Sequence, residues 1–181
     1  MRYAAPAIPD TSSLRNFAAM GEMGLLRQHM AGEDVRWVEA VAEEVRSSRY
    51  DDESEMRSIL DHSLWLGNPI EFTSGLFEID LICREFGGRK ARGKQREHLG
   101  EAQCIYALET LFGGHGTLLI DDLSASGMVK RRGLICIDTF DVLRNCYCAE
   151  LLRCPRPFDL LVEMKALGRG VRMPDSHSDI C

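Results

Sequence analysis

Residues 99–122 read LGEAQCIYALETLFGGHGTLLIDD and combine two patterns that decide the expected fold. After Glu101, apolar or small residues recur at the three- and four-residue spacing that buries one face of a helix. Residues 117–120 then form a short uninterrupted apolar run, which is typical of a strand buried on both faces. Asp121 and Asp122 follow at the carboxyl end of that strand, where open α/β sheets bind their ligands. We expect Glu101 and the two aspartates to converge there.

Carboxylates that converge in this way repel one another. Their repulsion raises their pKa values unless a cation neutralises the charge. Mg²⁺ and Mn²⁺ are hard cations that prefer oxygen ligands, so such a site favours these two ions. We therefore interpret residues 99–122 as half of a metal site.

The length and composition of the chain bound its class. With 181 residues, of which 45% are hydrophobic, it is long enough for one domain with a substantial core. Its net charge of -6 argues against a generally basic nucleic-acid coat, although a local basic patch can still serve. Seven cysteines form an odd count without paired CxxC spacing, which favours free thiols in a reducing cytoplasm. We expect a cytoplasmic protein without membrane contact, since the sequence shows neither a secretory signal nor roughly 18 consecutive apolar residues.

Hydrophobic periodicity predicts strands that alternate with helices, which favours a parallel sheet with right-handed crossovers. The predicted strands are residues 3–8, 35–38, 70–73, 117–120 and 134–137. The predicted helices are residues 14–26 with a break at the glycines, 41–46, 76–86, 101–112, 124–132, 142–152 and 158–167. We expect a single domain over residues 1–167, with a basic loop at residues 87–96 and a polar C-terminal tail at residues 168–181.

Asp10 follows the first predicted strand and precedes three hydroxyl residues at positions 11–13. An aspartate in this position commonly caps the following helix, so capping is the simplest interpretation of Asp10. Pro6 and Pro9 disfavour a central strand immediately before it. The acidic run at residues 51–55 matches no calcium-binding spacing and is better interpreted as the solvated start of a helix.

The predicted loop at residues 87–96 combines glycines with cations just before Glu101. Its cationic side chains are Arg89, Lys90, Arg92, Lys94 and Arg96. Long cationic side chains supply non-specific affinity for a phosphate backbone, so the loop could hold nucleic acid against the acids. A merely solvated loop fits the pattern equally well. The glycines match neither a P-loop nor a dinucleotide fingerprint, which disfavours binding of nucleoside triphosphates.

Four short stretches together resemble a PIN domain. They are Asp10 with Thr11 and Ser12, Val41 with Glu44 and Val45, Gly100 with Glu101, and Leu119 through Asp122. Their order and spacing are most similar to bacterial and archaeal PIN-like proteins related to the toxin nucleases of type II toxin/antitoxin pairs. The resemblance covers residues 5–152 and is strongest over residues 100–143.

The resemblance implies a fold, an activity and partners. The implied fold is a three-layer α/β/α, PIN-like arrangement around a central, mainly parallel sheet. The implied activity is a Mg²⁺- or Mn²⁺-dependent endoribonuclease, the toxin of a toxin/antitoxin pair. The implied partners are an RNA substrate, an antitoxin protein and a second copy of the chain.

The resemblance also assigns roles to residues. The implied catalytic acids are Asp10, Glu44, Glu101 and Asp122. The implied metal ligands are Asp10, Glu101, Asp121 and Asp122. The implied supporting polar residues are Ser12, Asp138 and Thr139. Two register choices stay open, because Glu43 rivals Glu44 and Asp121 rivals Asp122. The histidines lack zinc-site spacing, and His98 alone lies near the proposed site.

The chemistry of phosphodiester cleavage explains why several acids would be needed. A phosphodiester is already anionic, so attack by hydroxide is opposed until divalent ions neutralise the scissile phosphate. Two other functions fit the sequence. A PIN-like scaffold could bind RNA or a protein without turnover. A flavodoxin-like phosphatase could use Asp10 as a nucleophile, but Ser12 stands where a second acid would be expected.

Overall fold

The computed structural model describes residues 5–47, 53–87 and 97–181. Within these ranges the strands form one sheet, built from β1 (Pro6–Pro9), β2 (Asp34–Val35), β3 (Thr117–Leu119) and β4 (Ile135–Ile137). Their spatial order is β2-β1-β3-β4, and every neighbouring pair is parallel. The expected α/β architecture with a parallel central sheet is therefore confirmed.

β1 lies inside the sheet despite its two prolines, with β2 on one side and β3 on the other. Pro6 and Pro9 are its first and last residues, so the N–H groups that they lack fall at the ends of the strand. Asp10 resumes the hydrogen-bond ladder, since its N–H donates to Leu119 O at 2.9 Å. This bond fixes the start of the next helix against the end of β3.

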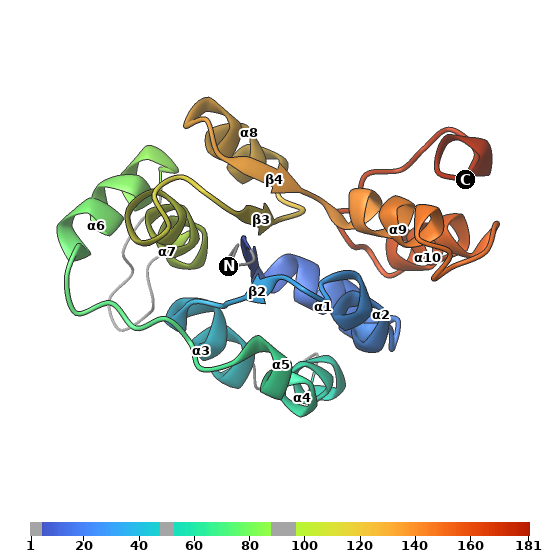
Figure 1. The fold of residues 1–181 in the computed structure, drawn as a ribbon, viewed down its shortest axis with the longest axis horizontal. Coiled ribbons are helices and arrows are strands. Elements are labelled where there is room, and N and C mark those ends of the chain that lie inside the picture. The colour runs from blue at the N-terminus through green and yellow to red at the C-terminus, as the bar shows by residue number, and fades with distance from the viewer. Residues whose placement is uncertain (1–4, 48–52, 88–96) are drawn as a thin grey trace.

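Helices connect and flank these strands. Their bounds are α1 (Thr11–Ala19), α2 (Met23–His29), α3 (Glu39–Ser47), α4 (Glu53–Asp61), α5 (Ser63–Leu66), α6 (Leu76–Glu85), α7 (Leu99–Tyr106), α8 (Leu123–Arg131), α9 (Thr139–Cys148) and α10 (Arg156–Ala166). In Figure 1, α6 and α7 lie on one side of the sheet, and α1, α2, α9 and α10 lie on the other. α7 continues directly into a π-helical stretch, η1 (Ala107–Leu111).

Contacts between helices bring distant parts of the chain together. α1 packs against α2, α3 and α4, and α3 packs against α7. Their inward faces carry the apolar side chains that the sequence spacing predicts, such as Phe17, Val41 and Ile105, all fully buried. As a result, the ends of β1 and β3, the middle of α3 and the start of α7 surround one region of the molecule.

The strand predicted at residues 70–73 is wrong. Ile70 makes an isolated parallel bridge with Val38, and the residues after it do not continue the pairing. Phe72 is buried while both of its neighbours are exposed, so the alternation seen in the sequence is real. Phe72 therefore anchors a connecting segment to the core, and the residues around it do not form a strand.

The residues after α10 fold back onto the domain. Val171 and Ile180 are buried, and a short 3-10 helix, η2 (His177–Asp179), lies between them. Arg172 binds the carboxylates of Asp138 and Asp141 at the start of α9. The segment that the sequence describes as a polar tail thus has apolar and ionic anchors.

None of the helices in the described ranges is both long enough and apolar enough to traverse a lipid bilayer.

Candidate functional site

Three of the predicted acids lie at the carboxyl edge of the sheet. Asp10 directly follows β1, while Asp121 and Asp122 follow β3, the strand beside it. Because neighbouring parallel strands end at the same edge, these acids start from adjacent positions. Which of them share a site then depends on the direction of each side chain.

Asp10 is buried, with 6% of its surface exposed, and caps α1. Its Oδ2 accepts hydrogen bonds from the backbone N–H of Ser12 at 3.3 Å and from the Ser12 hydroxyl at 2.9 Å. The capping role expected from the sequence is confirmed. Ser12 holds one oxygen of the carboxylate in place and leaves Oδ1 directed elsewhere.

Glu44 approaches Asp10 from the middle of α3. Its Oε2 accepts a hydrogen bond of 2.6 Å from the Thr11 hydroxyl, so the first residue of α1 fixes the end of this long side chain. Glu43 is exposed. Of the two register candidates, the structure thus places Glu44 beside Asp10 and turns Glu43 to solvent.

Glu101 lies in the first turn of α7 and is oriented by His98. His98 Nδ1 is 3.1 Å from Glu101 Oε1, and the imidazole stacks on Phe86 with ring centroids 5.2 Å apart. His98 has a left-handed backbone, with φ of 62°. A non-glycine residue in this region is uncommon and needs support from its surroundings. The stacking and the contact with Glu101 supply that support.

Gly100 shows how closely the acids approach one another. A Cβ atom at this position would lie 3.7 Å from Asp10 Oδ1, 3.7 Å from Glu44 Oε1 and 3.4 Å from Val41 Cγ2. The second oxygens of Asp10 and Glu44 therefore face the same point in front of α7. The serine and threonine hydroxyls hold the other oxygen of each carboxylate.

The pKa values show that three of the acids form one electrostatic cluster. Burial, then the negative charges of Glu101 and Glu44, raise the pKa of Asp10 to about 7, against the opposing hydrogen bonds from Ser12. Burial, and secondarily Glu101, also raise the pKa of Glu44. Burial and the charges of the same three acids raise the pKa of Cys104, which lies one turn beyond Glu101 on α7. We call Asp10, Glu44 and Glu101 the acid cluster.

Gln103 fixes the two helices of the acid cluster against each other. Its Oε1 accepts from the backbone N–H of Ala40 at 2.9 Å, and its Nε2 donates to Glu39 Oε1 at 3.0 Å. Gln103 thus satisfies a free N–H in the first turn of α3 from its position on α7. Because Glu44 and Glu101 lie on these two helices, this buried amide sets their relative position.

Asp121 has a different environment. It is 9% exposed, and its carboxylate accepts from the hydroxyls of Ser13 (3.0 Å) and Thr139 (2.6 Å) and from Asn16 Nδ2 (3.0 Å). The backbone N–H of Thr139 donates to it as well, at 2.9 Å. Asp121 therefore fastens α1 and the start of α9 to the end of β3, and these donors occupy both of its oxygens.

Asp122 is exposed and caps α8, accepting from Ala125 N–H at 2.6 Å. Together with Ser12, Asp122 lines a cavity of about 480 Å³ beside the acid cluster. Asp138, expected to be a supporting polar residue, caps α9 and binds Arg172. Thr139, expected in the same role, binds Asp121.

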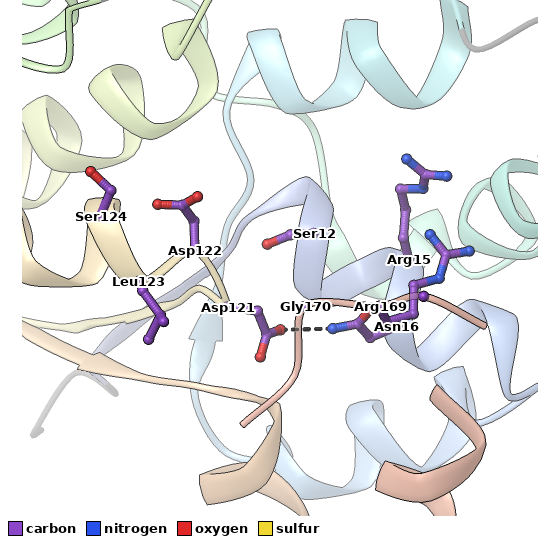
Figure 2. A pocket seen from close by; sticks show the side chains of 10 residues that line it. Ser12, Arg15, Asn16, Asp121, Asp122, Leu123, Ser124, Arg169 and Gly170 are labelled. Atoms are coloured by element: carbon purple, nitrogen blue, oxygen red, sulfur yellow. Dashed lines mark hydrogen bonds between the residues drawn. The ribbon is translucent and has the colours of Figure 1, made fainter. Parts of the chain in front are cut away.

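Two arginines that the sequence analysis did not select line the same cavity. Arg15 comes from α1 and Arg169 from the residues after α10. In Figure 2 their side chains and that of Asp122 lie on opposite sides of Ser12. Arg15 follows Thr11 by four residues, a spacing that places both on one face of α1, so the sequence did indicate that Arg15 lies near the site. Arg169 reaches the site only because the C-terminal segment folds back.

In the described parts of the chain, no set of three or more His, Cys, Asp or Glu side chains has the geometry of a metal site. The acid cluster thus consists of carboxylates that influence one another without forming a coordination sphere. The predicted nucleic-acid contacts Arg89, Lys90, Arg92, Lys94 and Arg96 lie outside the described residues.

In comparisons with known proteins, no family model, curated protein or solved structure matches the chain.

Proposed function

We propose that this protein is a Mg²⁺- or Mn²⁺-dependent endoribonuclease with a PIN-like α/β/α fold. The observation that supports it best is the convergence of Asp10, Glu44 and Glu101 at the carboxyl edge of a parallel sheet. Asp10 and Glu101, the first and last of these acids in the sequence, are 91 residues apart. RNA as the substrate and the toxin role follow from the sequence resemblance alone.

The chemistry of the acid cluster fits a hard divalent cation. All its donors are carboxylate oxygens, which Mg²⁺ and Mn²⁺ prefer. Asp10 Oδ1 and Glu44 Oε1 face one point in front of Gly100, where no side chain of that residue intervenes. A positive charge there would relieve the repulsion that raises the pKa of Asp10.

Each side chain has a defined task in this proposal. Ser12 and Thr11 hold one oxygen of Asp10 and Glu44, so the other oxygen of each is oriented for a cation. Asp122 lines the adjoining cavity and is exposed, so its carboxylate would be free to accept a hydrogen bond from water or substrate there. When bound, a divalent cation supplies charge neutralisation at the phosphate and lowers the pKa of water. Asp121 acts through the hydrogen bonds that join α1 and the start of α9 to the end of β3.

The test of this proposal is cleavage of a single-stranded RNA in the presence of Mn²⁺, Mg²⁺ or EDTA. We expect cleavage that depends on the metal and falls at least about 100-fold in D10N and E101Q, since each loses a charged ligand. E43Q is the matched control for E44Q, because Glu43 is the exposed neighbour on the same helix. Equal cleavage by the parent, D10N and E101Q, with or without metal, would refute the proposal.

A second candidate function is a PIN-like scaffold that binds RNA or a protein without turnover. The observation that favours it is the lack, within the described residues, of a three-ligand metal geometry. Calorimetric titration separates the two candidates. Heat of binding at millimolar Mn²⁺ that is lost in D10N supports the nuclease, and its absence from the parent protein supports the scaffold.

A further inference from the structure

The cavity beside the acid cluster has walls of opposite charge. Asp122, Asp121 and Ser12 contribute to its lining, and Arg15 and Arg169 line the side across Ser12 from Asp122. Arg15 is also close enough to Glu44 for its positive charge to lower the pKa of that acid, against the larger effect of burial. The two arginines therefore line a cavity that adjoins the acid cluster through Ser12, which lines the cavity and donates a hydrogen bond to Asp10.

The arginine side chains are held in place and partly withdrawn from solvent. Arg15 is 29% exposed and Arg169 is 17% exposed. Glu55, from α4, is 13% exposed and contacts both, with Oε2 lying 3.4 Å from Arg15 Nε and Oε1 paired with Arg169 Nη2. One carboxylate thus orients two guanidinium groups that come from opposite ends of the sequence.

A guanidinium group fixed in this way suits a phosphate. Its planar, forked donors match two phosphate oxygens, and prior orientation lowers the entropy lost on binding. A simple structural bridge between α1, α4 and the C-terminal segment is the competing explanation. That bridge would account for Glu55 but gives no reason for both arginines to line a cavity beside the acid cluster.

We infer that Arg15 and Arg169 form a binding site for a backbone phosphate of single-stranded RNA, next to the phosphate that the acid cluster would cleave. The inference rests on the proposed function, because it places the arginines along the same substrate strand. The acid cluster would bind cations, and the arginines would bind the neighbouring anion directly. Separate sites for the two charges allow an acidic protein to bind an acidic polymer.

The test uses the full-length protein and a single-stranded RNA in which one phosphate at a time is a neutral methylphosphonate. For the parent protein, we expect a roughly tenfold rise in KM when one phosphate beside the cleaved one is neutralised. R15Q and R169Q should have a KM raised by a similar factor and should be insensitive to neutralisation at that position. R27Q is the control, since Arg27 is an exposed arginine of α2 that does not line the cavity.

Binding provides a second measurement that does not need turnover. Fluorescence anisotropy with the D10N protein should show a salt dependence whose slope falls by about 0.7 for each arginine removed. Thermal unfolding identifies any variant that fails to fold, and R169K then replaces R169Q, because lysine keeps the charge and loses the forked geometry. R169K should bind the RNA more tightly than R169Q but less tightly than the parent.

The outcomes separate the two proposals. If the parent cleaves RNA while R15Q and R169Q retain its KM and its methylphosphonate pattern, the phosphate site is refuted and the nuclease stands. If the parent does not cleave but binds RNA with a methylphosphonate pattern that both arginine variants lose, the site stands and the nuclease fails. Binding that is identical in the parent and the two variants refutes the site in either case.

Discussion

Asp10 is a buried carboxyl group whose folded-state pKa, about 7, lies well above the ordinary value of 3.8. Between these two pH values the folded protein binds more protons than the unfolded chain, so its stability falls as the pH rises. Each pKa unit corresponds to about 1.4 kcal/mol, and the total for Asp10 is therefore a few kcal/mol. Burial raises the pKa values of Glu44 and Asp121 as well, which adds to the same trend.

We predict that the protein in EDTA is more stable to urea at pH 5 than at pH 8. D10N should reduce this difference by a few kcal/mol and should be more stable than the parent at pH 8, because the asparagine buries no charge. Its side-chain oxygen can still accept the hydrogen bonds of Ser12. Urea unfolding at the two pH values measures both effects, and an unchanged pH dependence in D10N would show that Asp10 is not the titrating group.

Gly100 offers a substitution that separates stability from function. Its backbone is helical and the contacts that a methyl group would make are ordinary, so we expect G100A to fold and to gain up to about 1 kcal/mol in unfolding free energy. The methyl group would occupy the point faced by Asp10 and Glu44, and the affinity for Mn²⁺ should fall at least about tenfold. G127A in α8 is the control. Equal Mn²⁺ affinities in G100A and the parent would show that the cation binds elsewhere.

Asp121 and Asp122 are adjacent in sequence but differ in their contacts, so the same change should act differently on each. D121N should cost about 1–3 kcal/mol, because an amide replaces an oxygen that accepts from Thr139 and Asn16. D122N should leave stability unchanged, since asparagine caps a helix as well as aspartate does. It should lower RNA cleavage. Urea unfolding and a cleavage assay measure the pair, and equal stability losses would contradict the assignment.

The resemblance, and not the local sequence patterns, grouped the three acids of the acid cluster. The local patterns predict a helix cap at Asp10, which the structure confirms, and an amphipathic helix that begins near Glu101. The sequence could not separate Asp121 from Asp122, because the start of α8 decides which side chain turns inward. It also could not select Arg169, whose position depends on the fold of the whole C-terminal segment.

At the scale of elements, the contact between α3 and α7 determines the geometry of the acid cluster. Replacing Gln103 by leucine removes the acceptor of Ala40 N–H and the donor to Glu39 while keeping a similar volume. We predict a loss of about 1–3 kcal/mol in unfolding free energy and a lower affinity for Mn²⁺. Q28L, on the exposed face of α2, is the control for the side-chain change. A Q103L protein with parental Mn²⁺ affinity would show that this contact does not position the acids.

The same scale shows where sequence patterns fail. The strands β3 and β4 fall within one residue of their predicted ends, because an uninterrupted apolar run marks each of them. Burial on both faces is the expectation for both strands and does not hold for β4, which is an edge strand with Ile135 exposed. The segment at residues 70–73 has the alternation of a strand and lacks a partner long enough to pair with. Pairing depends on tertiary arrangement, which no local pattern records.

At the scale of the whole molecule, the C-terminal segment completes the domain. Val171 and Ile180 are buried, and Arg172 packs on Phe140, with its guanidinium carbon 4.1 Å from the ring centroid. Composition alone cannot show this, because two apolar residues suffice to anchor a polar segment.

We predict that a chain ending after Leu167 unfolds at lower urea concentration than the parent and binds RNA more weakly, since it loses both buried side chains and Arg169. Urea unfolding and RNA anisotropy measure the two losses. R172A is the matched partial change and should cost about 1 kcal/mol or less, because its ion pairs are exposed. A truncated protein with parental stability would contradict the view that this segment belongs to the domain.

The central claim is that Asp10, Glu44 and Glu101 together form one binding site for a divalent cation. Calorimetric titration of Mn²⁺ tests this claim most directly. The account predicts binding by the parent protein that strengthens from pH 6 to pH 8, because protons compete for Asp10 below its pKa of about 7. It also predicts affinities at least about tenfold weaker in D10N, E44Q and E101Q, with E43Q equal to the parent. Binding of the same strength in all five proteins, or none in the parent, would contradict it.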